Sequence, residues 1–308
     1  MYKRQNKNFT WNTSITLSHN KNSVKKLTGE DVQLWEANFG YSQNTHIIGV
    51  NQPLGQMYGY VTDGLYQVSD FDYDAATKTY TLKDGVPYAG EKGNVKPGMW
   101  KFKNIDGSKD NKITEADKTV IGNAYPKIYG GINNTFTYKD FDLSIFLTYS
   151  IGNDVFNATK LTNTKTALQN KNVLAVADSK HRWVLVNKAG DLITDPQEMA
   201  DINKGKTVAA IYDNEAGDTY IHSWAVEDGS FLKLSNITLG YTFPKKMIRK
   251  VGLSKLRLYA TGSNLLTWTK YSGFDPEVST MGNGLTPGVD FGAYPRSRAF
   301  VFGINLAF

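Results

Sequence analysis

Residues 299–308 read Ala-Phe-Val-Phe-Gly-Ile-Asn-Leu-Ala-Phe and alternate strictly between two kinds of side chain. Large apolar residues occupy one phase, from Phe300 to Phe308, whereas the other phase is small or polar except for Val301. A period of two residues places alternate side chains on opposite faces of a β-strand. Large apolar residues on one face and small or polar residues on the other are typical of a transmembrane barrel strand, which contacts lipid on one side only.

The same alternation recurs in five segments upstream: residues 9–18, 128–138, 141–150, 237–243 and 256–266. In the third of these, Leu143 and Ile145 share the apolar face, whereas Asp142 and Ser144 share the other face. The sequence therefore predicts six antiparallel strands, each with one apolar face.

The connections between the six predicted strands alternate in length. Residues 20–126, 151–230 and 269–297 form long connections, whereas residues 139–140 and 244–254 form short ones. Antiparallel strands place alternate connections on opposite sides of a membrane, and outer-membrane barrels have short periplasmic turns and long extracellular loops. We therefore expect the three long connections outside the cell and the end of the chain on the periplasmic side.

A soluble sandwich or propeller is the alternative, because its half-buried strands alternate too. Two loops of such length would be unusual in a soluble domain, and aromatic residues near the strand ends resemble the girdles of a membrane barrel. We therefore predict an all-β fold, a transmembrane antiparallel β-barrel. Six strands cannot close a barrel without leaving backbone groups unpaired in lipid, so residues 1–308 are expected to be one part of it.

Composition excludes several other classes of protein. No apolar run of 18 residues is present, which excludes a transmembrane helix, and the absence of cysteine excludes disulfides and thiol catalysis. The net charge is +6, but the lysines are scattered, so no nucleic-acid partner is expected. The four histidines lack metal-ligand spacing and no catalytic motif appears, so we expect a protein that is not an enzyme.

Residues 106–117 have the spacing of an EF-hand-type calcium loop. Oxygen-bearing side chains and one carbonyl could supply the ligands, in the order Asp106, Ser108, Asp110, Lys112 (through its carbonyl), Thr114 and Asp117. Two features depart from that pattern, because Asn111 replaces the usual glycine and Asp117 replaces the bidentate glutamate. The alternative is a polar loop held by Asx-turns without a metal. Ca²⁺ is the only cofactor that the sequence suggests.

Several stretches, taken together and in order, resemble the SusC/RagA-like branch of TonB-dependent outer-membrane transporters of Bacteroidetes. They are residues 53–67, 106–122, 126–134, 141–147, 152–157, 231–241, 259–265, 275–277 and 294–298. The set covers nearly the whole chain except residues 68–90 and 160–220. The calcium-like loop departs from the Asn-Gly-Asp-Gly form usual in the family.

This resemblance implies the C-terminal portion of a plugged barrel of about 22 strands in the outer membrane. It implies import of oligosaccharides or peptides, driven by the TonB complex, with a SusD-like surface lipoprotein over the extracellular mouth. The signal peptide, TonB box and plug would belong to an N-terminal part absent from this chain. A surface adhesion or scaffold β-protein without transport is the alternative function.

Phe308 lies on the apolar phase of the last predicted strand. The family resemblance suggests that this terminal aromatic is an assembly signal for the barrel assembly machinery, which would recognise the strand by pairing with its edge. The alternative is that Phe308 adds only an interfacial aromatic contact with outer-membrane lipid.

Overall fold

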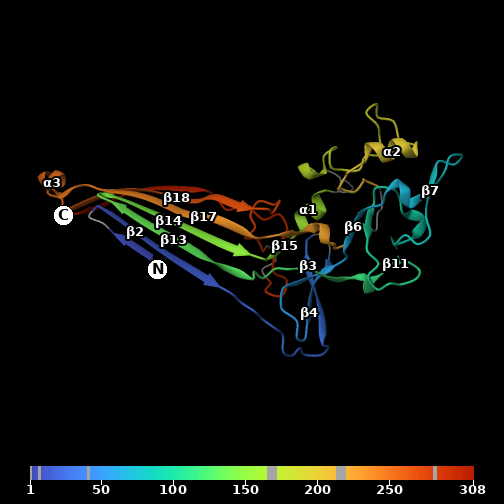
Figure 1. Cartoon of the computed structure of the whole chain (residues 1–308), viewed down its shortest axis with the longest axis horizontal. Coiled ribbons are helices and arrows are strands. Elements are labelled where there is room, and N and C mark those ends of the chain that lie inside the picture. Colours follow the sequence, from blue (N-terminus) through green and yellow to red (C-terminus); the bar gives the residue numbers. More distant parts are fainter. Residues whose placement is uncertain (1, 6–7, 40–41, 165–171, 213–219, 280–282) are drawn as a thin grey trace.

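A computed structural model describes residues 2–5, 8–39, 42–164, 172–212, 220–279 and 283–308. Figure 1 shows an elongated molecule with a long sheet at one end and a body of shorter strands and helices at the other. The C-terminus and α3 lie at the far end of the sheet, and the long connections gather at the opposite end (Figure 1). This is the separation of short and long connections that the sequence predicts.

The long sheet has seven strands, each hydrogen-bonded antiparallel to its neighbours in the order β1-β2-β13-β14-β17-β18-β20. The strands are β1 (Tyr2–Gln5), β2 (Phe9–Ser18), β13 (Ile128–Tyr138), β14 (Phe141–Ile151), β17 (Phe231–Thr242), β18 (Lys255–Thr269) and β20 (Ala299–Ala307). All six predicted strands are confirmed, although β17 begins earlier than expected, at Phe231. The seventh strand, β1, was not predicted because its four residues show no alternation.

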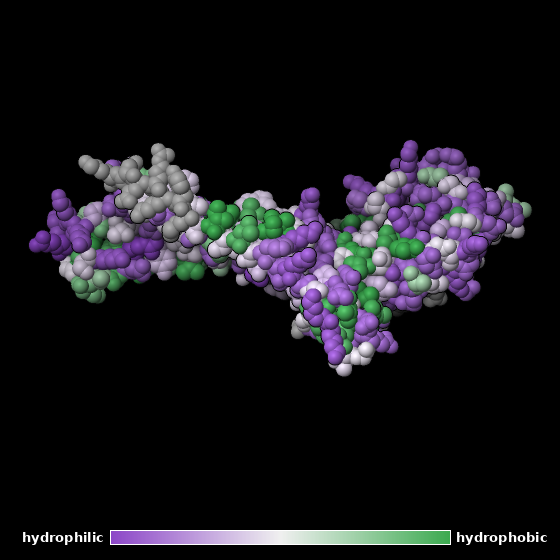
Figure 2. Space-filling view, turned by 60° about the horizontal axis from the view of Figure 1, so that its bottom comes forward, coloured by the Kyte–Doolittle hydropathy of each residue, from purple (hydrophilic) through white to green (hydrophobic). Residues whose placement is uncertain are grey.

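The pairing register places the apolar phases of the six long strands on one face. One row across the sheet joins Trp11, Phe136, Leu143, Leu239, Ala260 and Phe302. Phe302 is 79% exposed and Leu239 is 53% exposed, so the structure leaves this face uncovered. Figure 2 shows hydrophobic atoms at the surface along this part of the molecule. An apolar face of this extent is typical of a surface that contacts lipid or another protein.

The long connections fold into small sheets of their own. The first contains β3 (Val32–Asn38), β4 (Ser42–Gly49), β5 (Gln56–Gly59), β6 (Thr62–Leu65), η1 (Val68–Asp70), β7 (Phe71–Asp74), β8 (Thr79–Leu82), β9 (Tyr88–Ala89), η2 (Lys92–Asn94), β10 (Trp100–Phe102), β11 (Lys112–Ile113), η3 (Glu115–Asp117) and β12 (Thr119–Asn123). Strands β12, β5, β4 and β3 make one four-stranded sheet, and β6 with β10, β7 with β8 and β9 with β11 make pairs.

The remaining connections carry the helices. The second contains β15 (Asp154–Asn157), α1 (Ala158–Asn163), η4 (Ala175–Ala177), α2 (Pro196–Ile202), η6 (Ser223–Ala225) and β16 (Val226–Asp228). The short connection between β17 and β18 holds α3 (Lys245–Ile248) and η7 (Arg249–Val251), and the third long connection holds β19 (Val289–Asp290). Strands β16, β15 and β19 form a three-stranded sheet that joins the second and third long connections. No helix among the described residues is long and apolar enough to cross a membrane.

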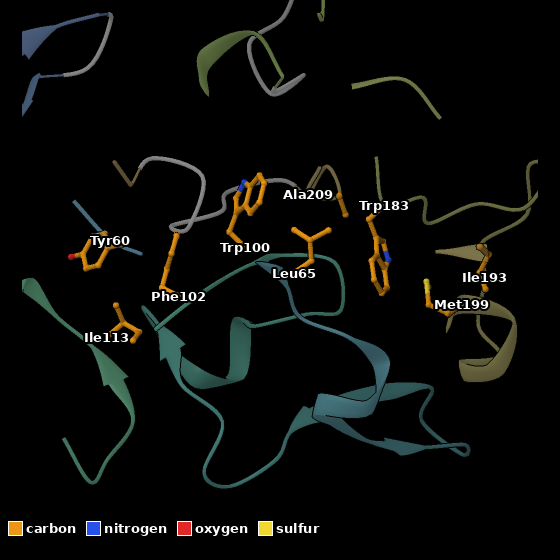
Figure 3. Close-up of a cluster of buried hydrophobic side chains, with 10 residues drawn as sticks. Tyr60, Leu65, Trp100, Phe102, Ile113, Trp183, Ile193, Met199 and Ala209 are labelled. Atoms are coloured by element: carbon orange, nitrogen blue, oxygen red, sulfur yellow. The ribbon is translucent and has the colours of Figure 1, made fainter. Parts of the chain in front are cut away.

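The buried core lies in these connections and not in the long sheet. Its largest cluster combines Tyr60, Leu65, Trp100, Phe102 and Ile113 of the first connection with Trp183, Ile193, Met199, Ala209 and Ala210 of the second (Figure 3). A second cluster adds Val289 of the third connection to Phe39 and Phe156. The three long connections therefore pack into one body at the end of the sheet, stabilised by burial of aromatic and aliphatic side chains.

Candidate functional site

A buried ion cluster joins the polar face of the sheet to the third long connection. The side chain of Lys233, in β17, is only 3% exposed, and its Nζ lies 3.4 Å from Asp275 Oδ1. The same Nζ also contacts the carboxylate of Glu277. Arg296 completes the cluster with Nη1 3.4 Å from Glu277 Oε2 and Nε 3.7 Å from Asp275 Oδ2. Buried charges are stable only when paired, so this cluster fixes residues 275–296 against the sheet.

A cavity of about 430 Å³ lies beside this cluster, between the ends of β13 and β14 and the third connection. Its walls include Tyr129, Thr148, Asp154 and Glu277. Asp154 Oδ2 accepts a hydrogen bond of 2.8 Å from the backbone N–H of Asn123. Burial raises the pKa of Asp154 above its usual value, and the charge of nearby Asp228 adds to this effect. The cavity therefore places two carboxyl groups near the end of the sheet.

A larger cavity, of about 730 Å³, opens between α1 and the third connection. We call it the aromatic cavity because Phe274 and Tyr294 line it and are 79% and 91% exposed. Its volume lies in the range of small-molecule sites, and exposed aromatic rings offer flat apolar surface to a ligand. The aromatic cavity thus presents exposed ring surface beside polar groups.

The charged groups in the wall of the aromatic cavity are already paired. Lys160 Nζ lies 3.0 Å from Glu227 Oε1 and 4.1 Å from the centre of the Trp224 ring. Burial acts to raise the pKa of Glu227, but hydrogen bonds from Ser272 and the charge of Lys160 lower it overall. Elsewhere in the wall, the Tyr271 hydroxyl donates a 2.5 Å hydrogen bond to the Asp290 carboxylate. These pairs hold the wall rigid and leave the two exposed rings as its contact surface.

The calcium-like loop is closed by hydrogen bonds between its own carboxylates and backbone N–H groups. Asp117 is fully buried and accepts hydrogen bonds from the N–H groups of Ile105, Asp106 and Thr114 at 2.7, 3.2 and 2.8 Å. Asp106 and Asp110 each accept an N–H two residues further on, from Ser108 and Lys112.

Two other features of the loop agree with its sequence. Asn111 has φ = 56°, the left-handed conformation in which glycine is usual. The Thr114 hydroxyl oxygen accepts the N–H of Ala116 and caps η3. The contacts match the Asx-turn alternative, and no group of three or more acidic or histidine side chains suited to a metal is found in the described part of the chain. Calcium binding at these six residues stays a prediction.

Phe308 lies just beyond the end of β20 at Ala307 and is 91% exposed. Its carbonyl oxygen accepts a hydrogen bond of 3.2 Å from the Ser254 hydroxyl, which ties the end of the chain to the start of β18. The structure thus places Phe308 at the outer edge of the sheet, but its role in assembly stays a prediction.

Sequence reasoning missed the charged residues of the polar face. Nothing in the spacing of Lys233, Asp275 and Arg296 along the chain predicts that they meet. A charged side chain inside an otherwise apolar and hydroxyl-bearing strand was the available signal. A second pair, Arg257 and Asp142, meets across β17 at 2.9 and 2.5 Å. Gly240 lies between them, and a Cβ there would lie 2.4 Å from the guanidinium, so the pair would have to shift to admit any other residue.

The chain is similar to TonB-dependent receptors from two bacteria. It is 31% and 30% identical to receptors P3 and P39 of Formosa agariphila, over 98% and 99% of its own length. It is 27% identical to TonB-dependent receptor SusC of Bacteroides thetaiotaomicron over 98% of its length. The chain spans about a quarter of the length of these relatives: 27%, 29% and 25%. No protein-family model matches the chain.

The fold is also that of solved transporter structures. The chain aligns over 99% of its length with the RagAB peptide importer in its open-open state, with a TM-score of 0.65 and 19% identity, and covers 27% of that chain. A second RagAB peptide transporter structure gives a TM-score of 0.63 and 20% identity, with 28% of that chain covered. These structures therefore support the assignment of the long sheet to a barrel wall.

Proposed function

The chain belongs to the SusC/RagA-like TonB-dependent receptors, which are not enzymes, and from this premise we propose that it forms the C-terminal strands of an outer-membrane importer of oligosaccharides or peptides. The full barrel would have about 22 strands and a plug, the size class of outer-membrane transporters. The plug, the TonB box and the contact with the TonB complex would belong to the part of the protein outside this chain.

The observation that carries the proposal is the seven-stranded sheet with one uncovered apolar face. Phe300, Phe302 and Ile304 are 67%, 79% and 63% exposed, which would be unfavourable in water and is favourable in lipid. The opposite face carries the paired charges of Arg257 and Asp142 and suits the interior of a barrel. Apolar residues outside and paired polar residues inside are what a transporter wall requires.

We further propose that the long connections form the extracellular body that contacts the substrate and a SusD-like surface lipoprotein. The aromatic cavity supports this proposal, because Phe274 and Tyr294 present exposed rings beside polar groups. Such a surface suits the apolar faces and hydroxyl groups of a sugar, or the side chains of a peptide.

Uptake by living cells tests the proposed function. Cells that carry the full-length protein are expected to accumulate labelled oligosaccharides or peptides, and this accumulation should stop when TonB is removed. The F274A/Y294A double variant should reduce uptake while the amount of folded protein in the outer membrane stays the same. Adhesion to surfaces without TonB-dependent uptake would overturn transport and favour the alternative of a surface adhesion or scaffold protein.

An inserted tag tests the direction of the chain in the membrane. Gly190 lies in an exposed turn of the second long connection, closed by a 3.1 Å hydrogen bond from its N–H to the carbonyl of Asn187. A tag at Gly190 of the full-length protein should bind antibody on intact cells, whereas a tag at Gly252, in the short connection, should bind only after the outer membrane is broken. The opposite result would invert the topology.

A further inference from the structure

The short connection between β17 and β18 is strongly basic. Its cations, together with the first residue of β18, are Lys245, Lys246, Arg249, Lys250 and Lys255. All five are exposed, and none of them forms an ion pair with another described residue. No acidic residue occurs between positions 243 and 255. We call residues 244–255 the basic turn.

Neighbouring elements neutralise only a small part of the charge of the basic turn. The carboxyl group of Phe308 reaches the turn, because its oxygen accepts a 3.2 Å hydrogen bond from the Ser254 hydroxyl, but it offsets only one of the five cations. The hairpin between β13 and β14 carries Lys139 and Asp140, whose charges offset each other, and its backbone meets the end of β17 through a 2.8 Å hydrogen bond from Thr242 N–H to the Asp140 carbonyl. Asp142 is already bound by Arg257. The five cations therefore produce a positive potential at this end of the sheet, which would attract anions.

The basic turn also exposes apolar side chains. Met247 is 62% exposed and Val251 is 71% exposed, although the two residues lie among the cations. Ile248 is only 4% exposed and anchors α3 to the sheet. Cations beside exposed apolar side chains on a short helical element are typical of a segment that lies in a membrane interface.

A small cavity lies within the basic turn. It has a volume of about 310 Å³ and is lined by Lys245, Arg249, Gly252, Leu253 and Ser254. Gly252, with φ = 77°, ends η7 and turns the chain back toward β18. Two cations around one cavity of this size suit the phosphate of a lipid headgroup.

The position of the basic turn in the fold agrees with this chemistry. Figure 1 places α3 at the end of the sheet, beside the end of the chain. Aromatic rings gather at the same end, since the Tyr241 ring lies 4.7 Å from Phe141 and 5.0 Å from Phe243, between centroids. Aromatic girdles mark the level of the headgroups in membrane barrels. The basic turn therefore lies next to the apolar face of the sheet, at the depth where the phosphates of membrane lipids would lie.

We propose that the basic turn binds the phosphate of an anionic phospholipid in the periplasm-facing leaflet of the outer membrane. Lys245 and Arg249 would hold the phosphate in the cavity, while Met247 and Val251 contact the acyl chains below it. This inference rests on the proposed function, because it requires the apolar face of the sheet to lie in a membrane. Each cation near an anionic lipid surface is worth about 1 kcal/mol, or about a fivefold change in affinity.

Lipid enrichment around the full-length protein tests the proposal. The protein is placed in nanodiscs of phosphatidylethanolamine mixed with phosphatidylglycerol, and the lipids that remain bound after mild detergent extraction are measured by mass spectrometry. Phosphatidylglycerol should be enriched, and the K245Q/R249Q variant should bind it about 25-fold more weakly, at about fivefold for each cation. A matched control, K109Q/K188Q, removes two exposed cations from the long connections and should keep the enrichment.

Equal enrichment in both double variants would overturn the proposal. If K245Q/R249Q fails to fold, the unaltered protein tests the proposal instead. Its enrichment in phosphatidylglycerol must fall as the salt concentration is raised. Failure of this inference leaves TonB-dependent uptake intact, whereas failure of the proposed function abolishes uptake, so the two are distinguishable.

Discussion

Arginine in place of Ile145 tests which face of the sheet meets lipid. Ile145 lies in β14 between Asn134 of β13 and Ile237 of β17, on the apolar face. The ten steps from Phe141 to Ile151 span about 34 Å at about 3.4 Å per residue. A tilt of about 40° reduces this to a height of about 26 Å, which matches the apolar band of an outer-membrane barrel. Ile145 then lies about 3 Å from the middle of the membrane.

Arginine near the middle of the bilayer costs about 2–4 kcal/mol on the lipid face of a barrel. The Ile145→Arg variant of the full-length protein should therefore lose that much free energy of unfolding. The adjacent Ser144→Arg variant points to the polar face, near Thr135 and Thr238, and should lose much less. Arginine at Phe141, at the end of the strand, should cost only about 0–1 kcal/mol, because the cost depends on depth.

The assay is reversible unfolding in guanidinium of protein inserted in lipid vesicles, followed by the change in gel mobility between folded and heat-denatured barrel. The three variants are compared at one lipid composition. Equal losses for Ile145→Arg and Ser144→Arg, or a larger loss at Ser144, would refute the facing assigned here. A cost that does not depend on depth would show that protein, and not lipid, covers the apolar face.

Four further predictions concern the body and the end of the chain. Lys233→Met leaves the buried Asp275 carboxylate with only the exposed Arg296 as its ion-pair partner and should cost about 3 kcal/mol in denaturant unfolding; an unchanged midpoint would contradict a structural role for the cluster. Burial lowers the pKa of His46 to about 4, so the folded protein keeps it neutral and should lose up to about 3 kcal/mol as pH falls from about 6.5 to about 4. The His46→Gln variant should lose less stability as the pH falls. If the variant and the unaltered protein show the same dependence of stability on pH, His46 is not the group responsible. Ca²⁺ should raise the thermal unfolding temperature of the full-length protein less when Asp106 and Asp110 are both asparagine, whereas no response to Ca²⁺ in either protein supports the Asx-turn alternative. Deletion of Phe308 should leave unfolded, protease-sensitive protein in the periplasm, whereas normal amounts of heat-modifiable barrel support a purely interfacial role.

The sequence by itself determined the six long strands and the face that each presents. The reason is local, because a strand repeats every two residues and its apolar phase can be read without knowing its neighbours. The turn at Lys139 and Asp140 and the alternation of connection lengths indicated in the same way which connections lie at the same end of the sheet. The short strand β1 was not predicted, because Tyr2–Gln5 has no such period. It forms by pairing with β2.

The tertiary structure alone decided how the long connections are built. They appeared as loops in the sequence, but they pack into one body because Phe102 and Trp183, far apart in the chain, share a single buried cluster. The ion cluster arises in the same way, since Lys233 meets Asp275 and Glu277 only after the third connection folds back over the sheet. Pairing and burial depend on contacts between distant residues, whereas the period of a strand depends only on near neighbours. The barrel wall could therefore be predicted from the sequence, and the aromatic cavity and the ion cluster could not.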